Sequence, residues 1–251
     1  MQIYLATTPA TLQEAAKYRQ TLAHVAYRIG PCSTLLRQNF RPVSQGGLLS
    51  VSDAGAPCVE DTGALCAAAL RECGRRGYTG VVLDFEDPQR PDLLSFARQL
   101  GPLLSSSRRT LYLPEHYGDT VQQATTLVCT AISGGNFAQH LQEAARNGQP
   151  HGLDVQRLRM DFRLPCRTGE GTPLTGEDFQ TLLKRESPAV FFAQDLCARY
   201  FTYNQNGDTH FVLFDDAETL RQKLKIGKSL GYTAAFFMWP EVADIAGELF
   251  G

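Results

Sequence analysis

The stretch Gly77-Tyr78-Thr79-Gly80-Val81-Val82-Leu83-Asp84-Phe85-Glu86-Asp87-Pro88 is the most informative part of this 251-residue chain. Its three consecutive aliphatic residues predict a buried strand, which ends abruptly in acidic residues. Because side chains alternate along a strand, Asp84 and Glu86 should point to one face and Phe85 to the other. Two carboxyls on one face repel each other, and this repulsion raises the proton affinity of one of them. The pair is therefore a candidate source of a general acid.

Short apolar runs alternate with amphipathic stretches on both sides of this segment. Strands are predicted at residues 3–6, 24–29, 48–51, 80–85, 110–113, 155–162, 189–193 and 233–239, with a further apolar run at 127–132. Helices are predicted at residues 9–22, 61–73, 91–104, 137–146, 176–184 and 216–230. This alternation predicts one domain over residues 1–251, an α/β fold closed as a (β/α)8 TIM barrel. An open doubly wound sheet is the alternative, but no glycine-rich nucleotide-binding motif supports it.

Two β-prone runs, residues 200–203 and 210–214, flank the segment Asn204-Gln205-Asn206-Gly207-Asp208. An Asn-Gly-Asp turn between such runs is typical of a β-hairpin. The predicted barrel therefore carries a β-hairpin insertion near strand 7.

Composition excludes several classes of partner. The chain has 24 basic and 26 acidic residues, whereas a nucleic-acid binder usually has a basic surplus. No apolar run approaches the roughly 20 residues that a membrane span needs. The N-terminal segment also lacks the basic region and apolar stretch of a signal peptide. We therefore expect neither a nucleic acid nor a membrane as partner, and the oligomeric state stays open.

The cysteines and histidines do not follow metal-binding or disulfide patterns. Seven cysteines are present without a C-x-x-C motif, which favours a reducing, cytoplasmic compartment. The five histidines are scattered and show no H-E-x-x-H spacing. We expect no metal site and no cofactor.

The acidic segment resembles the strand-four signature of glycoside hydrolase family 18, Asp-Gly-x-Asp-x-Asp-x-Glu. The signature matches at Gly80, Asp84 and Glu86, while its first two aspartates fall on Thr79 and Val82. The resemblance implies that Glu86 is the proton donor and that Asp84 orients the acetamido group of the substrate. In this family the acetamido oxygen of the substrate attacks the anomeric carbon, so a second carboxyl across the scissile bond is not needed.

This resemblance also implies a substrate class and a location. The substrate would be an N-acetylhexosamine glycan such as chitin or peptidoglycan. The small bacterial branch linked to spore germination and cortex lysis is the most similar, which implies a spore-associated protein.

Other segments resemble the family less evenly. Residues 212–231 and the strand ending in Trp239 are similar to its final units, which implies that Trp239 forms the sugar-binding floor; a core tryptophan is the alternative. The strand-six motif Met-x-Tyr-Asp falls on Met160-Asp161-Phe162-Arg163, where the tyrosine hydroxyl is absent. We expect these residues to contact substrate, with Asp161 or Tyr117 compensating for the hydroxyl.

Further candidates lie at the ends of other predicted strands. Tyr117 follows the fifth strand in either a substrate-contact loop or a solvated loop. Gln194 and Asp195 end the predicted seventh strand and would bind a sugar hydroxyl or simply cap the strand. The first functional hypothesis is a glycan hydrolase. A non-catalytic glycan-binding barrel and a structural, partner-binding barrel are the alternatives.

Overall fold

The computed structural model describes residues 1–41, 46–166 and 169–251. Within these ranges eight parallel strands form a barrel in the order β1-β14-β8-β7-β6-β5-β4-β2, and β1 also pairs with β2. The barrel strands are β1 (Gln2–Thr7), β2 (Thr21–Gly30), β4 (Leu48–Ser52), β5 (Gly80–Asp84), β6 (Thr110–Pro114), β7 (Ala124–Cys129), β8 (His151–Val155) and β14 (Ala234–Met238). The pairing of β1 with β2 closes the ring, so the predicted (β/α)8 barrel is confirmed and the open sheet is excluded.

Large side chains fill the inside of the barrel. The inward-facing cluster consists of Tyr4, Ala23, Leu48, Val82, Tyr112, Leu127, Ala234 and Phe236. The hydroxyls of Tyr4 and Tyr112 lie 3.0 Å apart, and the Phe236 ring contacts both tyrosine rings. The barrel is therefore a packed core rather than a pore, and space for a ligand remains only at its mouth.

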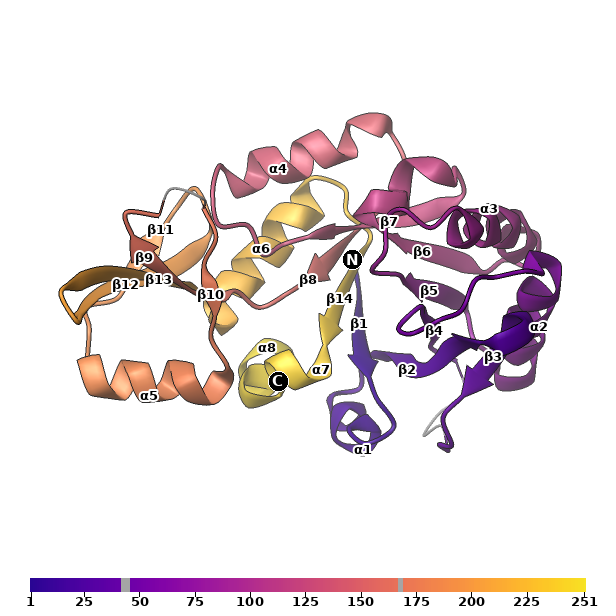
Figure 1. Ribbon diagram of the computed structural model, residues 1–251, viewed down its shortest axis with the longest axis horizontal. Helices are drawn as coiled ribbons and strands as arrows, with labels where there is room; N and C mark the ends of the chain where they lie inside the picture. The colour runs from indigo at the N-terminus through magenta and orange to yellow at the C-terminus, as the bar shows by residue number, and fades with distance from the viewer. Residues whose placement is uncertain (42–45, 167–168) are drawn as a thin grey trace.

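Helices cover the outside of the barrel. They are α1 (Leu12–Ala15), α2 (Thr62–Arg76), α3 (Pro91–Ser106), α4 (Phe137–Ala144), α6 (Ala217–Ser229), α7 (Trp239–Val242) and α8 (Ala246–Phe250). Short 3-10 turns occur at Ala16–Tyr18, Pro31–Ser33, Glu115–Thr120, Ala145–Asn147 and Ala243–Ile245, and strand β3 (Thr34–Arg37) extends the sheet beside β2. Figure 1 shows α2 and α3 side by side over one flank of the barrel. None of the described helices combines the length and apolarity that crossing a membrane would require.

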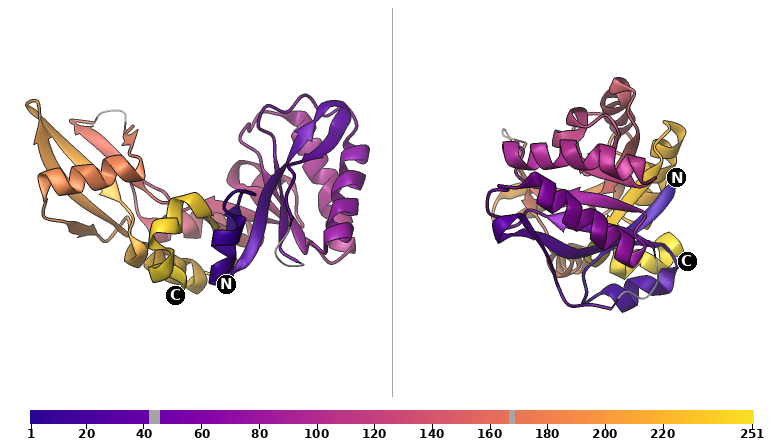
Figure 2. Two further views of the ribbon diagram at one scale, coloured as in Figure 1. Left: turned by 90° about the horizontal axis from the view of Figure 1, so that it is seen from below. Right: turned by 90° about the vertical axis from the view of Figure 1, so that its right-hand side faces the viewer.

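A second sheet is inserted between β8 and β14. Its strands are β9 (Arg159–Leu164), β10 (Thr172–Pro173), β11 (Phe191–Ala193), β12 (Ala198–Gln205) and β13 (Asp208–Phe214), and α5 (Gly176–Glu186) covers one face. Figures 1 and 2 show this inserted sheet projecting to one side of the barrel. The predicted hairpin is confirmed as β12–β13, whose turn residues Asn206 and Gly207 both have positive φ. The hairpin is thus one part of a larger insertion.

Two predicted barrel strands are corrected. Residues 155–162 were expected to form one strand, but the chain leaves the barrel after Val155 and enters the inserted sheet at Arg159. Residues 189–193 contribute β11, an edge strand of the inserted sheet, rather than the seventh barrel strand. The sixth and seventh barrel strands are β7 and β8. Apolar runs have the same appearance in either sheet, so local sequence could not distinguish them.

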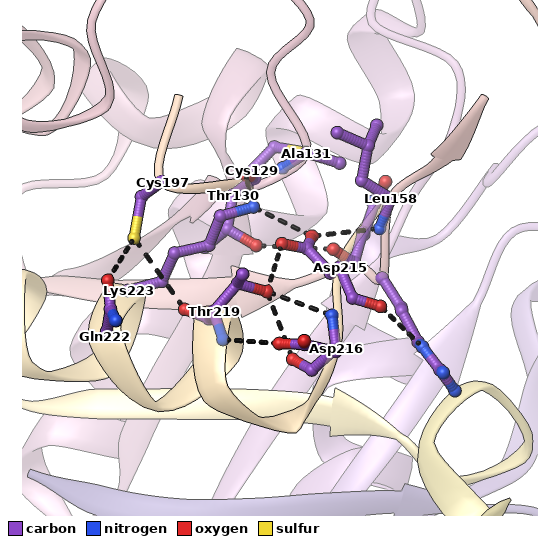
Figure 3. A network of polar contacts seen from close by, with 12 residues as sticks. Cys129, Thr130, Ala131, Leu158, Cys197, Asp215, Asp216, Thr219, Gln222 and Lys223 are labelled. Carbon is purple, nitrogen blue, oxygen red and sulfur yellow. Dashed lines mark hydrogen bonds and ion pairs between the residues drawn. The ribbon is translucent and has the colours of Figure 1, made fainter. Parts of the chain in front are cut away.

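A buried polar network joins the inserted sheet to the barrel (Figure 3). Lys223 of α6 donates to Asp215 Oδ2 at 2.8 Å and to the Thr130 carbonyl at 3.0 Å. The Asp215 carboxylate also accepts hydrogen bonds from the Leu158 backbone and the Thr219 hydroxyl. Leu158 precedes β9 and Asp215 follows β13, so the network fixes both connections of the insertion to the barrel.

Candidate active site

A cavity of about 100 Å³ lies at the carboxyl ends of the barrel strands. Its walls come from all eight barrel strands and include Ala6, Val25, Ser50, Asp84, Pro114, Leu127, Asp154, Phe236 and Met238. The carboxyl ends of the strands are where barrel enzymes place their functional groups. Two of the lining residues carry carboxyls, and the rest of the wall is mostly apolar.

Packing of Phe85 sets the direction of the acidic segment. The Phe85 ring is 2% exposed and lies against Phe96 of α3 and Tyr117, on the outside of the barrel. Asp84, one residue earlier, lines the mouth cavity. Glu86, two residues beyond the end of β5, is exposed, and its negative charge acts on Asp84. The acidic segment therefore places the Asp84 carboxyl at the mouth cavity, with exposed Glu86 two residues farther along the chain.

The electrostatics of the mouth favour a protonated carboxyl. Loss of hydration in the cavity wall raises the pKa of Asp84, and the negative charges of Glu86 and Asp53 raise it further. The three carboxyls come from the ends of β4 and β5, which are neighbours in the barrel. An acid with a raised pKa holds its proton closer to neutral pH, which is the property needed by a general acid or a hydrogen-bond donor.

Asp53, which sequence reasoning did not select, holds the loop that carries Glu86. Its carboxylate accepts hydrogen bonds from the backbone N–H of Glu86 at 3.1 Å and of Asp87 at 3.4 Å. The side chain is only 7% exposed. Farther along the loop, Arg90 donates to the Ala56 and Pro57 carbonyls of the preceding loop. The sequence signal that could have identified Asp53 is its position as an acidic residue directly after a barrel strand.

Tyr117 donates a hydrogen bond to the same loop and is too buried to contact a ligand. Its hydroxyl donates to the Asp87 carbonyl at 2.6 Å, and the side chain is 2% exposed. The expectation that Tyr117 contacts substrate or replaces a missing hydroxyl is therefore corrected. Its neighbours Glu115 and His116 are exposed.

Asp154, at the end of β8, is the second acidic residue of the cavity, and sequence reasoning missed it. Burial raises its pKa to about 6; the Gln156 hydrogen bond lowers it, and the charges of Glu241 and Asp84 add to the increase. Its position was hidden because residues 155–162 were interpreted as one strand. A carboxyl at the end of a correctly assigned barrel strand would have been a clear signal.

A larger cavity of about 450 Å³ adjoins this region, between the barrel and the inserted sheet. Gln156 and Glu241 line it, and Gln156 Nε2 donates to Asp154 Oδ2 at 2.8 Å, which links the two cavities. Met160 also lines the larger cavity. Of the residues expected from the strand-six resemblance, Met160 is thus the one that lies on a cavity beside the mouth.

Asp161 and Phe162 lie elsewhere on β9. Asp161 accepts a hydrogen bond from the Tyr203 hydroxyl at 2.7 Å and pairs with His210 at 3.0 Å, within the inserted sheet. Phe162 is 7% exposed and packs against Phe211 of the same sheet. The substrate-contact expectation is corrected for both, because β9 belongs to the insertion. The end of the true sixth strand reads Cys129-Thr130-Ala131, which also lacks a tyrosine.

Gln194 and Asp195 line a separate surface cavity formed with Asn136 and Gln222. Asp195 accepts a hydrogen bond from the Asn136 side chain, and its carbonyl accepts one from the backbone N–H of Phe137 at the start of α4. These contacts anchor a helix end to β11. The structure therefore corrects the expectation that both residues lie at the mouth of the barrel.

Trp239 is a core residue. Its side chain is 1% exposed, packs on Tyr18 at a ring-centroid distance of 5.3 Å, and donates to Glu14 Oε2 at 3.2 Å. It belongs to the outer cluster around Leu5, whereas its neighbour Met238 lines the mouth cavity. The expectation of a sugar-binding floor at Trp239 is corrected, because its contacts with Tyr18 and Glu14 hold the indole in this outer cluster.

Within residues 1–41, 46–166 and 169–251, no three His, Cys, Asp or Glu side chains are arranged to hold a metal ion. The carboxyls of the mouth are instead spread over different strands.

Comparison with known proteins shows similarity in fold alone. No family model matches the sequence, and no curated protein matches it. The spore cortex-lytic enzyme SleL of Bacillus cereus superposes with a TM-score of 0.67 at 15% identity, over 100% of this chain and 74% of that chain. A class V chitinase from Nicotiana tobaccum in complex with NAG4 gives 0.70 at 11% identity, over 99% and 98%. A GH18 chitinase from Cycas revoluta in complex with (GlcNAc)4 gives 0.67 at 12% identity, over 100% of both chains. The fold that the acidic segment implied is therefore the fold of chitinases and spore cortex-lytic enzymes.

Proposed function

We propose that this protein is a glycoside hydrolase that cleaves β-linked N-acetylhexosamine glycans. The observation that carries the proposal is the direction of the acidic segment. Phe85 is packed outside the barrel while Asp84 lines the mouth cavity, and the exposed Glu86 follows directly after this strand end. The shared fold with chitinases supports this assignment.

In the proposed reaction the acetamido oxygen of the substrate attacks the anomeric carbon while the bond to the leaving oxygen breaks. Glu86 gives its proton to that oxygen. Asp84 accepts a hydrogen bond from the acetamido N–H and stabilises the positive charge that develops on the ring. Water then attacks the anomeric carbon, Glu86 takes back a proton, and the acetamido group is restored.

The size of the mouth cavity agrees with this chemistry. A volume of about 100 Å³ equals roughly three water molecules, whereas whole-ligand pockets usually exceed ~300 Å³. An acetamido group is small enough to enter, while the sugar ring would stay above it. The cavity of about 450 Å³ beside the mouth offers room for neighbouring sugars.

A non-catalytic glycan-binding barrel is the second candidate. The end of the sixth barrel strand favours it, because Thr130 there is fully buried and its carbonyl is occupied by Lys223. This strand end therefore offers no tyrosine hydroxyl to the reacting group. Peptidoglycan and a spore-associated or cytoplasmic location remain proposals drawn from the resemblance.

The test is product analysis by mass spectrometry after incubation with N-acetylglucosamine oligomers and, separately, with wall muropeptides. Wild-type protein and a Glu60→Gln control, which changes an exposed carboxyl ahead of α2, should both release shortened products. Glu86→Gln should release none while keeping its fold and its affinity for the oligomer. Cleavage by Glu86→Gln at the wild-type rate would disprove the role of Glu86. Binding without cleavage by the wild type would establish the non-catalytic alternative.

A further inference from the structure

Asp154 and Asp84 line the same mouth cavity from different walls. Asp84 ends β5 and Asp154 lies on β8, and β6 and β7 separate these strands in the eight-stranded ring. A group that enters the cavity therefore meets a carboxyl on each side. Without Asp154, the carboxyl of Asp84 would lie on only one wall of the cavity.

The surroundings of Asp154 leave one carboxyl oxygen open to the cavity. Its Oδ2 accepts the hydrogen bond from Gln156, and among the described residues no hydrogen bond reaches Oδ1. Asp154 is paired in register with Cys129 on β7 and Phe236 on β14. The other charges that act on it, Glu241 and Asp84, are both negative.

Among residues 1–41, 46–166 and 169–251, no basic side chain lines the cavity beside Asp84 and Asp154. Burial and the negative charges of Glu241 and Asp84 disfavour the ionised form of Asp154, so Asp154 keeps its proton at weakly acidic pH. Burial raises the pKa of Asp154 to about 6 and also raises the pKa of Asp84. The cavity then presents one hydrogen-bond donor and one acceptor.

An amide is complementary to such a pair, because its carbonyl accepts and its N–H donates. We propose that Asp154 is a further substrate-contacting residue, whose protonated carboxyl donates a hydrogen bond to the acetamido carbonyl of an N-acetylhexosamine while Asp84 accepts from the acetamido N–H. This inference rests on the proposed function and extends it by naming a residue from the seventh barrel strand. It predicts that sugar binding weakens as Asp154 loses its proton.

The test is titration calorimetry with N-acetylglucosamine tetramer between pH 4.5 and 8, on a Glu86→Gln background so that the sugar stays intact. Glu86 does not contribute to the pKa shift of Asp154, so this background preserves the titration. Affinity should fall about tenfold as the pH rises through 6, because ionisation removes a neutral hydrogen-bond donor, and one such bond is worth up to about that factor. Adding Asp154→Asn keeps a neutral donor, so affinity should stay near its low-pH value throughout. Adding Asp154→Leu should lower affinity about tenfold at pH 5.

A Glu60→Gln change on the same background is the matched control and should preserve the pH dependence. Circular dichroism spectra establish that each variant is folded. If Asp154→Asn keeps the pH dependence, or if the tetramer does not bind at any pH, the inference is overturned. Hydrolysis by wild-type protein is measured separately. A lack of hydrolysis with pH-dependent binding would reject the enzyme proposal and keep the role of Asp154.

Discussion

Lys223 Nζ lies 2.8 Å from Asp215 Oδ2, and both side chains are completely buried. The lysine belongs to α6 of the barrel, and the aspartate lies where the chain returns from the inserted sheet. A buried ion pair is tolerated only when its remaining hydrogen-bonding groups are satisfied. Thr130, Thr219 and the Leu158 backbone meet this requirement. The pair therefore sets how the inserted sheet is attached beside the mouth.

Replacing Lys223 by methionine should lower the free energy of unfolding by about 3–5 kcal/mol, because Asp215 would be left as an unpaired buried charge. Urea unfolding followed by circular dichroism measures the loss. Lys225→Met is the matched control on the exposed side of the same helix and should change stability by less than about 0.5 kcal/mol. A double variant, Lys223→Met with Asp215→Leu, should recover much of the loss. Equal stability of the Lys223 and Lys225 variants would contradict the role of the pair.

Replacing Asp53 by alanine should impair hydrolysis without removing any group that touches substrate. The Glu86 and Asp87 backbone N–H groups would lose their acceptor, and misplacement of a catalytic group by about 1 Å can reduce the rate about 100-fold. We expect a 10- to 100-fold lower kcat, measured with N-acetylglucosamine oligomers. Asp53→Asn retains an acceptor oxygen and should lose less. Identical rates for both variants and wild type would show that the loop does not need Asp53.

The stability of the protein should depend on the charge of Asp154. The folded-state pKa of about 6 lies above the ordinary 3.8, so the native state holds this proton more tightly than the unfolded state. Its contribution is therefore favourable below pH 4 and is lost as pH rises to about 6, at a cost of roughly 1–3 kcal/mol. Asp154→Asn should raise the free energy of unfolding relative to wild type at pH 7 but not at pH 4. Urea titrations at pH 4 and pH 7 measure the difference in the free energy of unfolding between the variant and wild type. An equal difference at the two pH values would contradict the prediction.

Trp239 is the single tryptophan of the chain, so its fluorescence reports on one site. Because it is 1% exposed and bonded to Glu14, we expect blue-shifted emission and weak quenching by acrylamide. Addition of N-acetylglucosamine tetramer should leave this emission unchanged. A saturable shift on sugar addition would instead show that Trp239 contacts the ligand. Trp239→Phe provides the background signal.

Local sequence was sufficient for the fold class and for the position of the acidic segment at a strand end. Alternating apolar runs and amphipathic stretches predict a parallel sheet with helices outside, and the apolar run of β5 ends at Asp84, which lines the mouth cavity. The Asn206-Gly207 turn likewise defined its hairpin, because positive φ at both positions is what a two-residue connection needs. Each of these features depends only on residues that are close together in the sequence.

The remaining parts of the site depend on which strands become neighbours. The run at residues 155–162 reads as one strand, yet the Asp215 contacts of Leu158 draw its second half into the inserted sheet. That change of sheet moves Asp161 and Phe162 out of the mouth and leaves Asp154 in it. The position of Trp239 also depends on tertiary contacts, because Tyr18 and Glu14 keep the indole in the outer core. The sequence by itself determined the fold class and the acidic end of β5, since these follow from periodicity along the chain. Tertiary structure decided the partners of that pair, since burial and pairing between distant segments select among apolar runs that look alike.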